Sequence, residues 1–152
     1  MIEWQWAEFG ELTTDELYQV LRLRQQVFIV EQNCIYEDLD GLDQGAWHLI
    51  GWRAQKGGLR TIDAYLRVLG PGVKYQESSI GRVIVSQSAR GSGLGKALMN
   101  QALLMISKSL SNAPIRISAQ HHLEKFYSGY GFERVSEPYD EDGILHIEML
   151  KM

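Results

Sequence analysis

The spacing of apolar residues along the chain predicts three helices separated by short strands. Residues 13–30 open with a capping-box pattern at Thr13 and Glu16 and continue with apolar residues along one helical face. From Leu94, apolar residues again recur at helical intervals, and a shorter helical pattern begins at Leu123. The acidic segment after the first helix is predicted to be a loop or a short additional helix.

Runs of alternating or continuous apolar residues predict the strands. They fall at residues 2–9, 46–54, 60–69, 79–86, 114–120, 132–139 and 144–150. The dipeptide Asp142-Gly143 is a hairpin turn signal between the last two strands. Elements in this order predict an α/β (α+β) protein whose mixed sheet carries helices on its faces.

Composition and charge narrow the class of protein. A chain of 152 residues with 45% apolar and 22% charged residues is typical of one globular domain, expected over residues 1–152. The net charge of −4 argues against nucleic-acid binding through a basic surface. No apolar run approaches the roughly 18 residues of a membrane span, and the N-terminus has no signal-peptide pattern. Cys34 is the only cysteine, which fits a reducing compartment, so we expect a cytoplasmic protein that binds no membrane.

The stretch VIVSQSARGSGLGKALM, residues 83–99, carries the strongest chemical signal. It runs from an apolar strand, through a turn with three glycines between Arg90 and Lys96, into an amphipathic helix. A helix N-terminus presents unpaired N–H groups and a partial positive charge, and glycines let a phosphate approach that backbone closely. The two cations add to this attraction, so the turn predicts a pyrophosphate site.

Two familiar phosphate-binding loops do not match this turn. A P-loop requires a glycine and a serine or threonine at the positions of Arg90 and Ala97. A dinucleotide-binding turn requires a third glycine where Lys96 stands. The remaining alternative is a glycine-rich connection without a ligand, against which the glycine spacing and the flanking cations argue.

Residues 90–95 instead fit the pattern R-x-x-G-x-G between a strand and a helix. This resembles the coenzyme A-binding motif of the GNAT superfamily of N-acetyltransferases, and the element order is similar over nearly the whole chain. The segment LEKFYSGYGF, residues 123–132, resembles the late F-Y-x-x-x-G-F helix of that superfamily. Resemblance to its ElaA-type branch extends to residues 21–43, His48, residues 80–86 and residues 118–127. Ile35 departs from that branch, which has proline there.

The resemblance implies a mixed, mostly antiparallel sheet of about six to seven strands with helices on both faces. It also implies that two central parallel strands, residues 81–86 and 115–120, splay apart and hold acetyl-CoA, the acyl-donor cosubstrate, in the gap. The residues implied to bind this donor are Val83, Ile84 and Val85 along the pantetheine arm, Arg90, Gly91, Ser92, Gly93, Leu94, Gly95 and Lys96 at the pyrophosphate, and Gln120 and Tyr127.

Acyl transfer from a thioester to an amine requires a proton acceptor for the amine and a proton donor for the departing thiolate. The resemblance implies that Tyr127 is the general acid, although its helical spacing alone would make it a packing aromatic. The general base is open between Glu31, acting directly or through water, His48 and His122. An exposed glutamate is usually only solvated, and a histidine within an apolar strand is usually a hydrogen-bonded core residue.

The acceptor is expected near the acidic segment after the first helix. The residues predicted to contact it are Glu31, Asp38, Asp40 and His122. In one interpretation the carboxylates draw a cationic amine toward the cleft, and in the other they form a solvated loop. The spacing fits neither an EF-hand nor a zinc site, so no metal is expected, and Cys34 is predicted to be a small buried residue.

These features together predict an acetyl-CoA-dependent N-acyltransferase. We expect a primary amine of a small molecule or peptide to attack the acetyl group directly in a ternary complex. The alternative is a non-catalytic acyl-CoA-binding sensor or protein-interaction module on the same fold. A homodimer is compatible with the sequence, because the last hairpin strand offers an edge for pairing.

Overall fold

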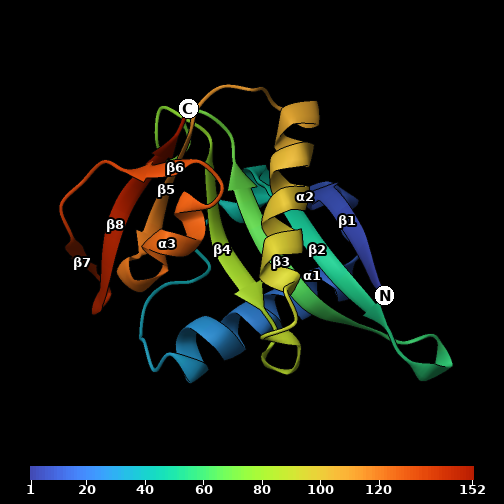
Figure 1. The fold of residues 1–152 in the computed structure, drawn as a ribbon. Helices are drawn as coiled ribbons and strands as arrows, with labels where there is room; N and C mark the ends of the chain where they lie inside the picture. The colour runs from blue at the N-terminus through green and yellow to red at the C-terminus, as the bar shows by residue number, and fades with distance from the viewer.

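The computed structural model describes residues 1–152, which form two sheets with helices on both faces (Figure 1). The strands are β1 (Ile2–Glu8), β2 (Trp47–Ala54), β3 (Arg60–Leu69), β4 (Ser79–Val85), β5 (Ile115–Gln120), β6 (Phe132–Arg134), β7 (Tyr139–Glu141) and β8 (Ile144–Lys151). The helices are α1 (Thr14–Arg24), α2 (Leu94–Ser109) and α3 (Glu124–Ser128). None of these helices is both long and apolar enough to cross a membrane.

Pairing within each sheet is antiparallel. The first sheet has the order β1-β2-β3-β4, and in the second the central strand β8 pairs with β5, β6 and β7. The predicted hairpin joins β7 to β8, where Asp142 and Gly143 have φ values of 52° and 83°, the left-handed conformations of a tight two-residue turn. The predicted α/β class is confirmed, with eight strands in two sheets.

The two sheets meet where β4 lies parallel to β5, and they are joined there at one end only. A single parallel bridge pairs Ser78 with Ile115, and the N–H of Arg116 donates to the Ser78 carbonyl at 2.9 Å. Beyond this bridge the strands diverge (Figure 1). The predicted splay is therefore confirmed, and it leaves the facing edges of β4 and β5 without strand partners.

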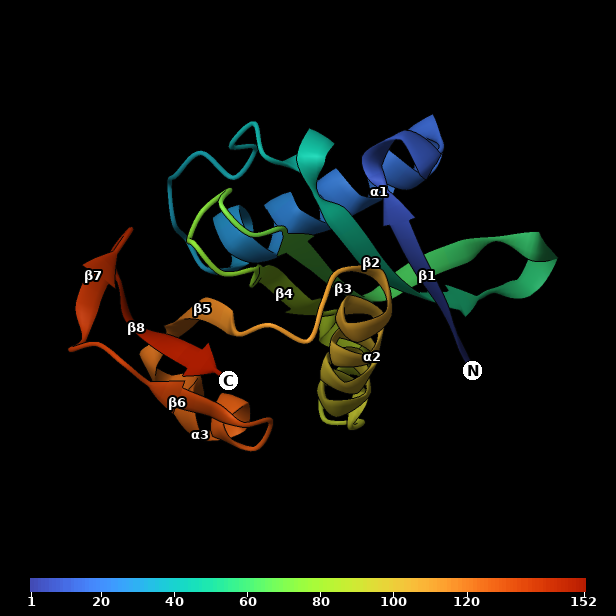
Figure 2. The same ribbon diagram turned by 90° about the horizontal axis from the view of Figure 1, so that it is seen from above.

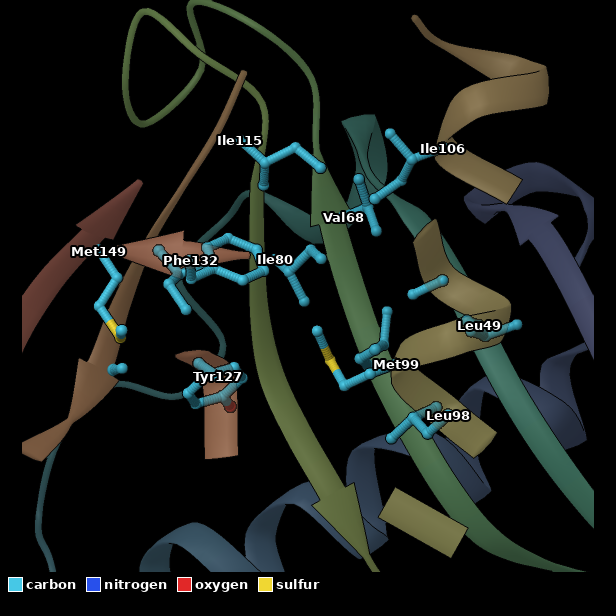
Figure 3. Close-up of a cluster of buried hydrophobic side chains, with 14 of the residues drawn as sticks. Leu49, Val68, Ile80, Leu98, Met99, Ile106, Ile115, Tyr127, Phe132 and Met149 are labelled. Atoms are coloured by element: carbon cyan, nitrogen blue, oxygen red, sulfur yellow. The ribbon is translucent and has the colours of Figure 1, made fainter. Parts of the chain in front are cut away.

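Helices α1 and α2 lie on opposite faces of the first sheet (Figure 2), and apolar side chains pack on each face. Beneath α1, Val20 is buried in a cluster that includes Ile84 of β4. On the opposite face, a larger cluster contains Leu98 of α2, Tyr127 of α3 and Met149 of β8. Figure 3 shows that this cluster continues from the first sheet to the second. Side chains on the α2–α3 face therefore hold the two sheets together.

Two predicted elements differ in the structure. The first predicted helix becomes π-helical over Gln25–Glu31, a form that is frequent at functional sites. The strand predicted over residues 132–139 is divided into β6 and β7. Pro138 has no N–H for a strand ladder, and at the break the Ser136 hydroxyl accepts a hydrogen bond from the Glu148 N–H at 2.8 Å.

Candidate active site

A pocket of about 320 Å³ lies between the diverging strands β4 and β5. Residues 80–83 of β4 and 117–120 of β5 form its side walls, and Tyr127 of α3 closes one face. Phe28 of the π-helical segment and His146 of β8 also line it. A volume of this size lies within the range of about 300–1,000 Å³ that small-molecule sites commonly have.

The glycine-rich turn begins beyond the C-terminal end of β4, as predicted. Gly91 and Gly93 have φ values of 82° and 83°, which glycine adopts without strain. A Cβ atom on either residue would meet no atom within 4 Å, so the turn borders open space. Helix α2 begins at Leu94, and its first unpaired N–H groups therefore lie at this turn.

The two cations that flank the turn differ in their surroundings. The Arg90 guanidinium pairs with the Glu31 carboxylate at 2.8 Å and donates from Nε to the Val85 carbonyl at 3.1 Å. Lys96 is exposed on the first turn of α2. An anion at the turn would compete with Glu31 for Arg90.

Tyr127 combines a buried ring with a place in the pocket wall (Figure 3). Its ring packs edge-on against Phe126 and Phe132, with centroids 5.1 and 6.2 Å away. Burial raises the pKa of the Tyr127 hydroxyl to about 12, so the group keeps its proton at neutral pH. The packing and general-acid interpretations of this residue are therefore compatible.

The structure does not bring the predicted bases into the pocket with Tyr127. Glu31 borders a separate hollow beside α1. His48 is fully buried, and its Nε2 donates to the Asp43 carbonyl at 3.0 Å while its Nδ1 accepts from the Tyr65 hydroxyl at 2.7 Å. Burial lowers the pKa of His48, although Asp43 opposes the shift. This is the placement of a hydrogen-bonded core histidine, not of a base that meets a substrate.

The remaining predicted residues are divided between the pocket and its surroundings. Val83 and Gln120 line the pocket, whereas the side chain of Ile84 is buried beneath α1. His122 is exposed on the turn before α3 and does not line the pocket. Cys34 is buried as predicted and also borders the pocket.

The acidic loop (residues 31–43) folds over a buried arginine. Arg24, at the end of α1, has no exposed surface. Its guanidinium pairs with Asp38 at 3.0 Å and with Asp43 at 2.6 Å, and it donates to the Asp38 carbonyl at 2.9 Å. Asp38 is itself buried, so its carboxylate is an internal ion-pair partner and is closed to the amine that it was predicted to contact.

Two arginines of the first sheet balance the rest of this charge. Arg67 of β3 pairs with Asp40 at 2.8 Å and with Asp43 at 3.0 Å. Arg82 of β4 pairs with Asp38 at 2.7 Å and with Asp40 at 3.3 Å. Burial would raise the pKa of Asp40, but hydrogen bonds from Arg67 and the loop backbone outweigh it and hold that pKa well below its usual range. Asp38, Asp40 and Asp43 are thus balanced by three arginines, and they leave no surplus negative charge to attract a cationic amine.

Arg82 occupies an irregular point in β4. Its φ is 54°, which is uncommon for residues other than glycine, and the register between β3 and β4 shifts here. A β-bulge redirects the side chains around it. The irregularity places Arg82 against the acidic loop while Val83 lines the pocket.

Several polar residues of the pocket were not predicted from the sequence, and three of them lie close together. Ser118 of β5 and Glu141 and His146 of the β7–β8 hairpin all line it. Glu141 accepts a hydrogen bond from Ser118 at 3.3 Å, and its other oxygen lies 3.4 Å from Nε2 of His146. The turn signal at residues 142–143 predicted the hairpin, but no local pattern shows that it folds back over the gap.

Comparison with known proteins places this geometry in a family. The sequence matches the family described as acetyltransferase (GNAT) domain over residues 62–152, a range that holds β4, the glycine turn and α3. The chain therefore belongs to the GNAT acetyltransferase family.

Two relatives are similar over the whole chain. Protein ElaA of Escherichia coli strain K12 is 41% identical over 153 residues, which cover 99% of this chain and 97% of that protein. The crystal structure of Escherichia coli ElaA covers all of both chains with a TM-score of 0.90. An acyl-CoA N-acyltransferase from Pseudomonas aeruginosa is 42% identical over all of both chains, with a TM-score of 0.92. The resemblance to the ElaA-type branch is thus confirmed.

A more distant structure shares the fold. An aminoglycoside 6'-N-acetyltransferase complexed with coenzyme A is 13% identical, covers 97% of this chain and 96% of its own, and has a TM-score of 0.67. The GNAT family is one of acyl-CoA-dependent acyltransferases, so the predicted class of activity is confirmed. The acetyl group, the amine acceptor and the catalytic residues stay predictions.

Proposed function

We propose that this protein transfers an acetyl group from acetyl-CoA to a primary amine, with residues 1–152 acting as one catalytic domain. The observation that carries the proposal is the pocket between β4 and β5 together with the open glycine turn at the end of β4. Coenzyme A has an anionic pyrophosphate end and a thiol end. The glycine turn suits the first of these, and the pocket suits the second.

The residues present fit coenzyme A. The turn from Arg90 to Lys96 offers main-chain N–H groups, two cations and unobstructed space to a pyrophosphate. The edge of β4 at residues 83–85, which has no strand partner on the side of β5, suits a pantetheine arm that pairs as an added strand would. Bound acetyl-CoA supplies an activated thioester.

Residues of this chain then meet the chemical needs of the transfer. The amine nitrogen bonds to the carbonyl carbon, and a main-chain N–H near Val85 stabilises the oxyanion. As the carbon–sulfur bond breaks, Tyr127 gives its proton to the thiolate and regains one from the former amine. Residues 80–85 of β4 include no carboxylate, so the first proton of the amine is taken by a group elsewhere in the pocket.

The proposal is tested by measuring coenzyme A binding by calorimetry and thiol release from acetyl-CoA with a panel of polyamines, amino acids and peptide amines. Tyr127→Phe is expected to lower kcat at least about ten-fold while the Kd for coenzyme A changes little. Tyr130→Phe, in the turn directly after α3 and outside the pocket wall, is the control and should retain the wild-type rate. An unchanged rate for Tyr127→Phe would remove the acid role.

The sensor alternative makes a different prediction for the same measurements. A non-catalytic acyl-CoA-binding protein would bind coenzyme A and gain thermal stability from it, yet release no thiol with any amine on the panel. Absence of coenzyme A binding would contradict both functions.

A further inference from the structure

We propose that His146, supported by Glu141, takes the proton from the acceptor amine; this inference rests on the proposed function. Both side chains belong to the β7–β8 hairpin and line the pocket that Tyr127 also lines. The chain would therefore use an acid from α3 and a base from the hairpin.

The two groups reach the pocket from opposite faces of the second sheet. On the face covered by α2 and α3, Ala119 and Ile147 are buried in the same cluster as Tyr127. Because successive side chains of a strand alternate between faces, His146 and its partner across the ladder, Gln120, project from the other face. A proton acceptor on one face and a donor on the other can serve the amine and the thiolate without competing.

Hydrogen bonding fixes the tautomer of His146. Its Nδ1 lies 2.7 Å from the Ile144 carbonyl, which can only accept, so Nδ1 carries a proton and donates it. In the neutral ring, Nε2 then holds an unshared electron pair. This nitrogen lies 3.4 Å from a carboxylate oxygen of Glu141, so two acceptors face one another across the edge of the pocket.

Two adjacent acceptors are complementary to a group with several N–H donors, such as an alkylammonium. Glu141 is held in position because its second oxygen accepts from Ser118, which is also hydrogen-bonded to Tyr139. Glu141 and Tyr139 of β7 lie against His146, and its neighbour on β5 is the neutral Gln120. The same pocket is lined by the charged residues Lys74, Arg82 and Asp142. The Glu141 carboxylate thus lies beside the nitrogen that would accept the proton.

The protons of the reaction balance in this arrangement. The alkylammonium gives one proton to Nε2 of His146, and the neutral nitrogen forms the new C–N bond. The C–S bond breaks, the thiolate takes the proton of Tyr127, and the second surplus proton of the nitrogen restores the tyrosine. His146 returns its proton to solvent after the amide leaves, which gives one amide, one free thiol and one proton per cycle.

The test compares His146→Asn with the wild-type protein in acetyl-CoA turnover, using the primary alkylamine of the panel that the wild type acetylates fastest. Asparagine retains a short N–H donor for the Ile144 carbonyl but has no basic nitrogen. At pH 7 we expect kcat to fall about 100-fold, with the Kd for coenzyme A within two-fold of the wild-type value. His121→Asn, on the turn before α3 and outside the pocket wall, is the matched control and should keep the wild-type rate.

Raising the pH to 9.5 separates a base from a merely structural residue. An alkylamine with a pKa of about 10.4 loses its proton to solvent increasingly over this interval. The ratio of the wild-type kcat to the His146→Asn kcat should therefore shrink at least ten-fold. Glu141→Gln, which alters a half-buried carboxylate, should lower kcat about ten-fold and show the same recovery. A loss for His146→Asn that is equal at both pH values, or no loss at all, would overturn the inference while leaving the proposed function intact. A wild-type protein that binds coenzyme A but acylates no amine would overturn both.

Discussion

The glycine turn and the acidic loop are two charged loops at the same gap, but the fold uses their charges differently. In the turn, Arg90 is exposed and Gly91 and Gly93 border open space. In the loop, Asp38 and Asp43 are buried against arginines. The counter-charge of Arg90, Glu31, is exposed and can be displaced by a ligand, whereas the buried pairs of the loop cannot be reached.

The difference also concerns what each loop contributes to stability. The three aspartates of the acidic loop meet Arg24 of α1, Arg67 of β3 and Arg82 of β4, so they tie three elements together. Buried charges need such partners, because the loss of water is otherwise uncompensated. The turn has only an exposed pair between Arg90 and Glu31, a kind of pair that contributes little.

The largest effect is expected when the buried network loses its central cation. Arg24→Met leaves Asp38 and Asp43 buried with one ion pair fewer each, and it should lower the free energy of unfolding by about 3–5 kcal/mol. Arg60→Met, which breaks a partly exposed pair with Glu16, should cost at most about 1 kcal/mol. Urea unfolding measures both. Equal losses for the two variants would contradict the distinction between buried and exposed charge.

A smaller effect is expected when acid titrates the same network. For Asp43, burial alone would raise the pKa, but pairing with Arg24 and Arg67 outweighs it and lowers the pKa. For Asp40, burial is likewise outweighed, by Arg67 and the loop backbone. The unfolded chain therefore binds these protons first as the pH falls. Their stabilisation is complete above the unfolded pKa of about 3.9 and is lost progressively below it. Urea midpoints should decline less steeply below pH 4 for Asp40→Asn than for the wild type; equal slopes would contradict this.

The smallest effect on stability is expected in the turn. Gly93→Ala and Gly72→Ala each place alanine at a φ of 83° with no neighbour within 4 Å of the new Cβ, so each should cost about 1 kcal/mol. Only Gly93→Ala should also weaken coenzyme A binding, by about ten-fold or 1.4 kcal/mol, because its Cβ enters the space offered to the pyrophosphate. Calorimetry and urea unfolding provide the two readouts. Equal coenzyme A affinity for the two variants would show that the turn does not bind the ligand.

Much of the fold could be predicted because its signals are local. The capping box at Thr13 is present, with its hydroxyl accepting from the Glu16 N–H at 3.1 Å. Gly131 has the left-handed conformation expected of it, with a φ of 90°, although α3 ends three residues earlier and Gly131 closes the turn that follows. The glycine turn was recognisable for the same reason, since one continuous stretch holds the strand end, the glycines and the helix start.

The rest of the site could not be predicted, because it depends on which distant residues meet. Arg67 and Arg82 alternate with apolar residues on strands, and nothing near them in the sequence identifies the acidic loop as their partner. His146 similarly resembles any polar residue of an antiparallel strand. Its position at the pocket follows from the pairing of β5 with β8 and from the way the hairpin folds back. Both depend on contacts between segments that are distant in the sequence.

The bridge at Ser78 has a mechanical consequence. Because β4 and β5 share this one contact point, a small rotation about it alters the width of the gap without breaking any hydrogen bond of the two sheet ladders. Resistance to that rotation comes from the apolar side chains packed behind the gap, so their packing limits how far the gap can widen.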